Sequence, residues 1–175
     1  MKSGQPAFLQ IHGWSVFAHP LFLAQLESLV QQVEALKLKD PAGYMKKNAT
    51  KRLAAITRLA FDTIPQDPAR TEYRQGNTLG GDHKHWLRAK FFQQYRLFFR
   101  YHAPSKVIVL AWVNDEDTKR AYESSADAYR VFRKMLESGH PPDDWNQLLA
   151  AALAENQRLQ RLVVDMSGGS SSPPG

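Results

Sequence analysis

The feature that most constrains the fold is the segment 83–114, which reads HKHWLRAKFFQQYRLFFRYHAPSKVIVLAWVN. Turn-forming residues divide it into three runs, with Gln93-Gln94 after the first run and Ala103-Pro104-Ser105 after the second. Runs of this length joined by such short connections predict three antiparallel strands. The third run, 107–113, is apolar at every position, so we expect it to be the central, buried strand.

The first two predicted strands carry aromatic and cationic side chains on one face. At period two, this face holds Trp86, Arg88, Lys90 and Phe92 from the first strand and Arg96, Phe98 and Arg100 from the second. Cationic groups on one face repel one another unless an anion neutralises them, and interleaved rings can stack on unpaired bases. The pattern favours RNA as a ligand. The alternative is a solvated basic face that only promotes solubility.

Apolar residues at helical spacing predict two helices before this sheet. A short strand is expected over 13–18, followed by a helix over 21–38 whose apolar residues recur three or four positions apart. Asp40-Pro41 ends this helix, and a second helix continues to about residue 64. The two should form an antiparallel hairpin. The segment 65–81 is rich in Pro and Gly and is expected to be a loop.

Two further helices are expected after the sheet. The third runs from Asp127 to Leu136, and the fourth follows Asp143 and Asp144, either of which can cap it. The fourth helix has a seam of residues at alternating spacings of four and three, namely Trp145, Leu149, Ala152, Asn156, Leu159, Val163 and Met166. A polar Asn in such a seam can select register and partner number, so this helix pairs either with another chain or with its own domain.

These elements predict an α+β fold, in which an N-terminal helical hairpin packs on a small antiparallel sheet with helices at the C-terminus. We expect a domain over 1–142, a C-terminal helix over 143–166 and a disordered tail over 167–175. The tail is expected to be disordered because it contains only Gly, Ser and Pro.

Composition limits the chemistry open to this chain. Its 175 residues include no Cys, which excludes disulfides, thiolate metal sites and cysteine nucleophiles. A formal charge of +6 and a pI of about 9.6 favour acidic partners. The start of the chain does not resemble a signal peptide, and the longest apolar run, 107–113, is far shorter than the roughly 20 residues of a membrane-spanning helix. We therefore expect a soluble, cytoplasmic protein with no membrane contact.

Motifs for metals and nucleotides are weak in this sequence. Gly76, Gly80 and Gly81 lack the spacing of phosphate-binding loops. His83 and His85 stand two positions apart and could share a metal, but no third ligand of the right kind is expected nearby. The acidic run 115–117 follows a strand and is typical of a capping turn. We therefore predict no metal and no other cofactor.

RNA cleavage can proceed without carboxylates, because the RNA 2′-OH is itself the nucleophile. The reaction needs an acceptor for the 2′-OH proton, a positive charge at the crowded phosphorane and a proton for the leaving 5′-oxygen. Arg and Lys provide the charge, and Lys90 beside Arg88 is a candidate acid or base. His83, His85 and Tyr122 are the other proton-transfer candidates.

Several longer runs together resemble the YhaV toxin family, within the RelE/ParE superfamily of bacterial toxins. These runs are GWSVFAHP, KDP, WLRAKFFQQYRLFFRY, VIVLAWVNDEDTKRAY and DAYRVFRKMLESGHPPDDW, spread over about Gly13 to Trp145. The resemblance implies a RelE-like fold and an endoribonuclease that cleaves mRNA at the ribosome. It also implies neutralisation by a PrlF-type antitoxin.

The resemblance implies site residues as well. RelE-like nucleases present basic residues from adjacent strands and a Tyr near the last helix. The catalytic candidates that match this pattern are Arg88, Lys90, Arg96, Arg120 and Tyr122. The expected RNA contacts are His83, Lys84, His85 and Arg100.

Two alternatives stay open at this stage. One is a toxin of the same fold that binds and poisons a protein without hydrolysis. The other is a module that binds RNA without cleaving it. Incubation with RNA or with translating ribosomes distinguishes both from a nuclease.

Overall fold

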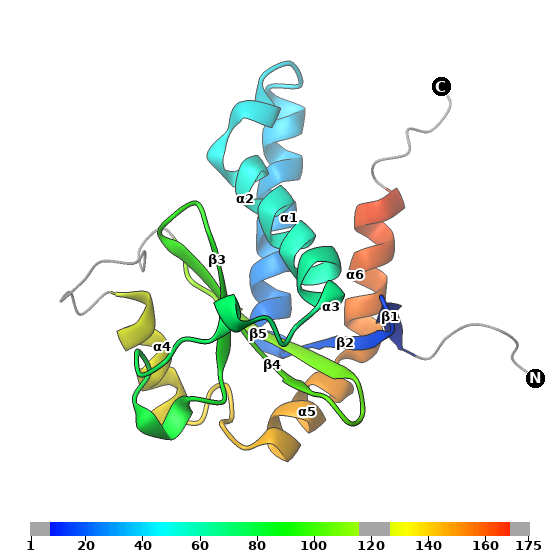
Figure 1. Ribbon diagram of the computed structural model, residues 1–175. Helices are drawn as coiled ribbons and strands as arrows, with labels where there is room; N and C mark the ends of the chain where they lie inside the picture. The colour runs from blue at the N-terminus through cyan, green and yellow to red at the C-terminus, as the bar shows by residue number, and fades with distance from the viewer. Residues whose placement is uncertain (1–7, 116–126, 169–175) are drawn as a thin grey trace, which may run out of the picture.

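The computed structural model describes residues 8–115 and 127–168, which build a five-stranded mixed sheet with helices around it (Figure 1). The strands are β1 (Leu9–Ile11), β2 (Trp14–Ala18), β3 (Leu87–Phe91), β4 (Tyr95–His102) and β5 (Val107–Val113). Their order across the sheet is β1-β2-β5-β4-β3, with β2 and β5 parallel and all other neighbours antiparallel. The prediction of an antiparallel sheet is confirmed for β3, β4 and β5. It is wrong for the sheet as a whole, because β2 joins β5 in the parallel direction.

The helices are α1 (Pro20–Lys39), α2 (Asn48–Arg58), α3 (Ile64–Gln66), α4 (Ala128–Glu137), α5 (Trp145–Ala154) and α6 (Asn156–Gly168). The chain turns at 40–47, so that α1 and α2 run side by side, and a π-helical segment at 59–63 joins α2 to α3 (Figure 1). The structure confirms the predicted helices over 21–38 and 127–136 as α1 and α4. Within the described ranges, no helix is both long and apolar enough to span a membrane.

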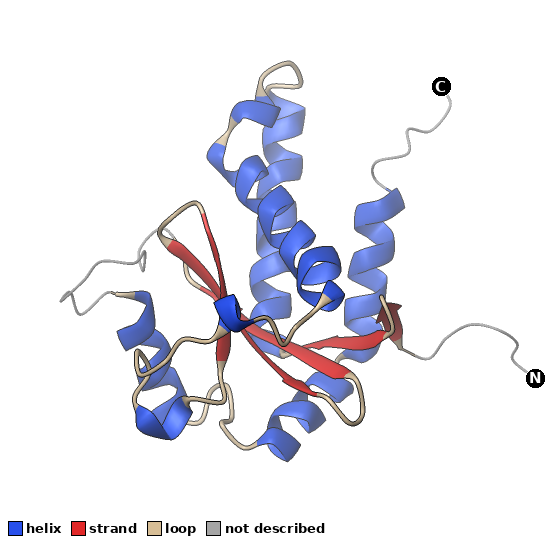
Figure 2. Ribbon diagram, in the orientation of Figure 1, coloured by secondary structure: helices blue, strands red, loops and turns tan. Residues whose placement is uncertain are grey.

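Strand β5 is buried on both faces, as its apolar sequence predicts. Ile108 and Leu110 belong to the hydrophobic cluster formed with α1, α2 and α6. Val109 and Ala111 belong to a second cluster formed with α4 and α5. Figure 2 shows helices on either side of the sheet, and β5 therefore supports both layers.

The C-terminal segment, predicted as a helix over 143–166, forms the two helices α5 and α6. Helix α5 ends at Ala154, because its C-cap Glu155 has φ and ψ of −109° and 19°, outside the helical range, and α6 then runs in a new direction (Figure 1). The break lets Leu148 pack in the cluster beside α4 while Leu159 packs in the cluster beside α1.

Helix α6 is also held by an ion pair. Two guanidinium nitrogens of Arg158 lie 2.9 and 2.7 Å from the two carboxylate oxygens of Glu27 on α1. Of the two open interpretations of the heptad seam, the structure supports the one in which the C-terminal helices pack on their own chain.

Helix α1 begins at a buried histidine cap. His19 Nδ1 accepts a hydrogen bond from the Leu21 N–H at 3.1 Å, and the His19 N–H donates to the Leu110 carbonyl of β5 at 2.8 Å. His19 is 6% exposed. Burial, helped by the nearby His140, lowers the pKa of its imidazole to about 4.

This cap predicts a loss of stability in mild acid. The pKa of His19 falls from 6.5 to about 4 on folding, so between these two pH values the unfolded chain binds a proton that the folded chain does not. The contribution of neutral His19 to stability is therefore complete above pH 6.5 and is lost as the pH falls from 6.5 to 4. The expected loss is on the order of 3 kcal/mol between pH 7 and pH 4. Urea denaturation of wild type and His19→Asn over this range measures it, because Asn retains a cap acceptor but does not titrate. Equal pH dependence in the two proteins would contradict the prediction, and His102→Asn is the control at an exposed site.

Candidate active site

Three of the predicted catalytic cations lie on the face of the β3–β4 hairpin that packs against α4. Lys90 is paired with Arg96 across the two strands, and Arg88 is paired with Phe98. Lys90 is exposed, whereas Arg88 and Arg96 are only 9% and 5% exposed. Of these three predicted catalytic cations, only Lys90 is exposed to solvent. Helix α4 covers the two arginines because Phe98 stacks on Phe132 of α4, with ring centroids 4.2 Å apart.

Both buried arginines donate to one phenol. The Nε atoms of Arg88 and Arg96 lie 2.8 and 3.0 Å from the hydroxyl oxygen of Tyr129 on α4. Arg88 Nη1 also donates to the Glu72 carbonyl, and Arg96 Nη1 to the Gln93 carbonyl, both at 2.7 Å. Within 8–115 and 127–168, no carboxylate forms an ion pair with either guanidinium. The group formed by Arg88, Arg96 and Tyr129, here called the arginine–tyrosine group, therefore concentrates positive charge beneath α4.

Tyr129 is the functional candidate that sequence reasoning missed. The predicted tyrosine, Tyr122, and the predicted Arg120 both lie outside the described residues. Tyr129 stands on the buried side of α4, two positions after Asp127, whose carboxylate caps the helix by accepting from the Tyr129 N–H at 3.2 Å. A tyrosine at helical spacing from Phe132 could have been noticed in the sequence, because a buried phenol requires a hydrogen-bond partner.

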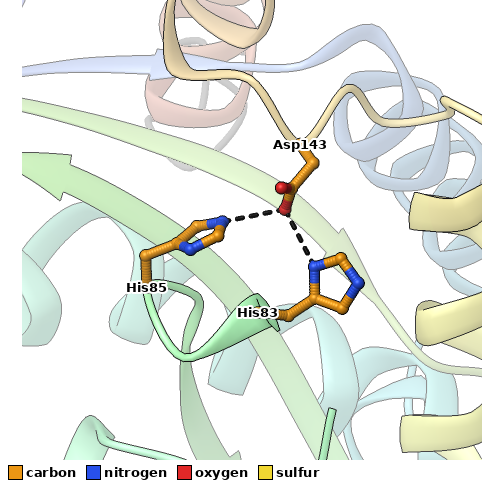
Figure 3. Close-up of side chains that lie close together, drawn as sticks. All are labelled: His83, His85 and Asp143. Carbon is orange, nitrogen blue, oxygen red and sulfur yellow. Dashed lines mark hydrogen bonds and ion pairs between the residues drawn. The ribbon is translucent and has the colours of Figure 1, made fainter. Parts of the chain in front are cut away.

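A second cluster lies at the start of β3, where two histidines meet an aspartate (Figure 3). His83 Nδ1 and His85 Nε2 lie 3.1 and 2.8 Å from Asp143 Oδ1, and Trp86 Nε1 donates to the same oxygen at 2.8 Å. Asp143 stands 60 residues after His83, in the linker between α4 and α5. The expectation that no third ligand type lies near the two histidines is thus wrong, because the fold brings this carboxylate to them. Asp144, the other residue predicted to cap the fourth helix, is the N-cap of α5.

Hydrogen bonds keep the Asp143 carboxylate ionised. Burial acts to raise its pKa, but the hydrogen bonds from Trp86 and His85, the charge of His85 and the hydrogen bond from His83 outweigh burial and hold the pKa below its usual value. Asp143 is therefore a negative charge at the otherwise basic start of β3.

Arg100 connects this cluster to the sheet. Its guanidinium carbon lies 5.5 and 5.3 Å from the ring centroids of Trp86 and Trp145, and its Nη1 donates to the Asp143 carbonyl at 2.6 Å. Burial lowers the Arg100 pKa, while nearby Asp143 and Asp144 oppose this shift. Arg100, predicted as an RNA contact, thus holds the α4–α5 linker against β4 in this structure.

A basic pocket opens next to His85. It has a volume of about 440 Å³ and is lined by Arg74, Gly76, Lys84, His85, Leu87 and Tyr101. Two predicted RNA contacts, Lys84 and His85, therefore share one hollow with a further cation and an aromatic ring. Such a lining suits a phosphate group and an unpaired base.

Comparison with known proteins identifies the family. Residues 16–153 match the Toxin_YhaV family model, described as a toxin with endonuclease activity, of a toxin-antitoxin system. The chain belongs to the YhaV toxin family. The toxin YhaV of Escherichia coli O6:H1 and the ribonuclease toxin YhaV of Escherichia coli (strain K12) are each 48% identical to it over 141 residues, which span 79% of this chain and 92% of each relative. No solved structure matches the chain. The resemblance to the YhaV family read from the sequence is confirmed.

The arginine–tyrosine group of this YhaV family member generates a stability prediction. Tyr129→Phe removes the acceptor that two buried guanidinium groups share, and each unsatisfied donor costs about 1–3 kcal/mol. We therefore expect a loss of at least about 1 kcal/mol in the free energy of unfolding, measured by urea denaturation. Tyr101→Phe is the matched control, because it removes a phenol oxygen from β4 without touching either arginine. Equal stability of the two variants would contradict the bonding described here.

Proposed function

We propose that this chain is the toxin of a toxin-antitoxin pair and acts as an endoribonuclease on mRNA. Its family supplies the endonuclease activity and the toxin-antitoxin context, and the relative from Escherichia coli (strain K12) is named a ribonuclease toxin. One observation supports the assignment of the site: exposed Lys90 is paired across the strands with Arg96 and so lies beside the arginine–tyrosine group. We further propose a RelE-like fold, action at the ribosome and a PrlF-type antitoxin.

In the proposed reaction, a base takes the proton of the RNA 2′-OH and the 2′-oxygen bonds to the adjacent phosphorus. The bond from phosphorus to the 5′-oxygen then breaks, and an acid gives a proton to the leaving 5′-oxygen, which leaves a 2′,3′-cyclic phosphate. Lys90 is an exposed cation beside the arginine–tyrosine group, so its ammonium contacts the phosphate and stabilises the charge that builds up on the phosphorane. Arg88 and Arg96 are already bonded inside the protein. They act through their fixed positive charge, which is screened less beneath α4 than it would be in water.

Other residues complete the proposed site. The phenol of Tyr129 joins Arg120 and Tyr122 among the candidates for proton transfer or phosphate contact. The pocket beside His85 suits the RNA strand next to the cleaved bond, with Lys84 as its phosphate contact. His83 and Arg100 support this pocket through Asp143.

The first test is Lys90→Ala in the purified protein. Lys90 is exposed, so the variant should fold normally, and loss of one transition-state donor typically lowers kcat by about 10²–10³-fold. Cleavage of a labelled mRNA with and without ribosomes measures the effect. Lys39→Ala, which removes an exposed lysine at the end of α1, should cleave at the parent rate. A parent rate for Lys90→Ala would remove Lys90 from the site.

A second test separates binding from chemistry. RNA with 2′-O-methyl groups lacks the attacking hydroxyl, so the toxin should bind it with unchanged affinity and leave it intact. Cleavage of this RNA would exclude attack by the 2′-OH. If unmodified RNA and translating ribosomes also remain intact, the protein is a binding module or a toxin that poisons a protein.

The antitoxin generates a third prediction. If it covers the basic face, the complex should bind the 2′-O-methyl RNA more weakly than the free toxin does, because the same cations cannot serve both partners. A gel-shift titration of toxin and complex measures the two affinities. Equal affinity would mean that the antitoxin acts without covering this face.

A further inference from the structure

We propose that His83, His85 and Asp143 form a binding site for a divalent transition metal ion of the zinc type. The site lies at the junction of β3 with the α4–α5 linker. It does not depend on the proposed nuclease function.

The ligand set is the first argument. Two imidazole nitrogens and one carboxylate oxygen are ligands that Zn²⁺ takes in proteins, and three protein ligands leave one position open for water. The three candidate ligand atoms, one from each residue, all lie within 4.8 Å of one another. Figure 3 shows both imidazole rings directed at the carboxylate from the same segment of chain.

The distances need little adjustment to admit a metal. Metal–ligand bonds of about 2.0–2.1 Å in tetrahedral geometry place two ligand atoms about 3.3 Å apart. The observed separations from Asp143 Oδ1 are 3.1 Å to His83 and 2.8 Å to His85. The imidazole nitrogens of His83 and His85 lie within 4.8 Å of each other. Side-chain rotations that bring all three separations to about 3.3 Å would let an ion replace the hydrogen bonds between the imidazoles and the carboxylate.

The carboxylate is already held in position by a residue outside the ligand set. Trp86 is completely buried and packs edge-on against Phe132, with centroids 5.1 Å apart, so its indole N–H is fixed. This N–H donates to Asp143 Oδ1. Partners of this kind orient metal ligands and contribute to metal affinity.

The basic surroundings oppose metal binding, because nearby cations repel a divalent cation. Arg100 is a neighbouring cation, but it donates to the backbone carbonyl of Asp143 and lies over two indole rings. In the described part of the chain, the Asp143 carboxylate pairs only with His83 and His85 and with no Lys or Arg. Its charge therefore remains available to a metal. The side chains of His85 and Asp143 are 38% and 37% exposed, so an ion can reach them.

A bound ion would join segments that are far apart in the sequence. The histidines stand just before β3, while Asp143 precedes α5, and the links described between these segments are hydrogen bonds and ring contacts. A metal would stabilise this junction by mass action, because the unfolded chain does not hold the three ligands together.

The test is zinc titration of the full chain, prepared without a histidine tag and freed of metal with a chelator. Calorimetry should give one Zn²⁺ per chain, Zn²⁺ should raise the Tm relative to chelator, and Co²⁺ should show the visible absorption of a tetrahedral site. His85→Gln and Asp143→Asn should each weaken zinc binding by about 100-fold or more, since even loss of a supporting partner costs 10–100-fold. Thermal unfolding in chelator checks that both variants fold.

His12→Asn is the matched control. His12 Nε2 lies 2.9 Å from Asp62 Oδ1, which makes a similar histidine–aspartate pair with only one imidazole, and its φ of 50° suits Asn. This variant should bind zinc as wild type does. Absence of saturable binding to wild type, or equal binding to wild type and Asp143→Asn, would overturn the proposal and leave a hydrogen-bonded cluster. RNA cleavage is not the readout, so either result leaves the proposed function unaffected.

Discussion

The central strand β5 packs against helices on both of its faces, with Ile108 and Leu110 toward α1 and Val109 and Ala111 toward α4 and α5. It also bonds to β4 on one edge and to β2 on the other. Both helix layers and both halves of the sheet therefore depend on this strand. Burial of its apolar side chains fixes the position of the β3–β4 hairpin, and with it the cations of the candidate active site.

The burial of Arg88 and Arg96 beneath α4 sets two effects against each other. Moving a guanidinium out of water costs several kcal/mol, and an unbonded donor adds to that cost. The Tyr129 hydroxyl and backbone carbonyls satisfy these donors without neutralising the charge. Among the described residues, the result is positive charge beside exposed Lys90, which suits a site that must stabilise an anionic phosphorane more than it suits a stable core.

The linker between α4 and α5 contacts the start of β3 and also strand β4. Its Asp143 accepts from His83, His85 and Trp86 through the carboxylate and from Arg100 through the backbone carbonyl. Because Trp86 also packs on Phe132 of α4, the histidine cluster and the arginine–tyrosine group are supported by the same helix.

Local patterns in the sequence determined the hairpin strands, the buried strand at 107–113, and helices α1 and α4, because each of these elements depends on residues a few positions apart. The sequence also determined the family, because continuous runs of residues resemble those of its members. Tertiary structure alone decided the parallel pairing of β2 with β5, the burial of Arg88 and Arg96, the role of Tyr129 and the approach of Asp143 to the histidines. These features join residues that are 33 to more than 50 positions apart, as in Arg96 with Tyr129 and His85 with Asp143. Such contacts depend on how the sheet and the helix layers pack together, and local periodicity in the sequence does not predict this packing.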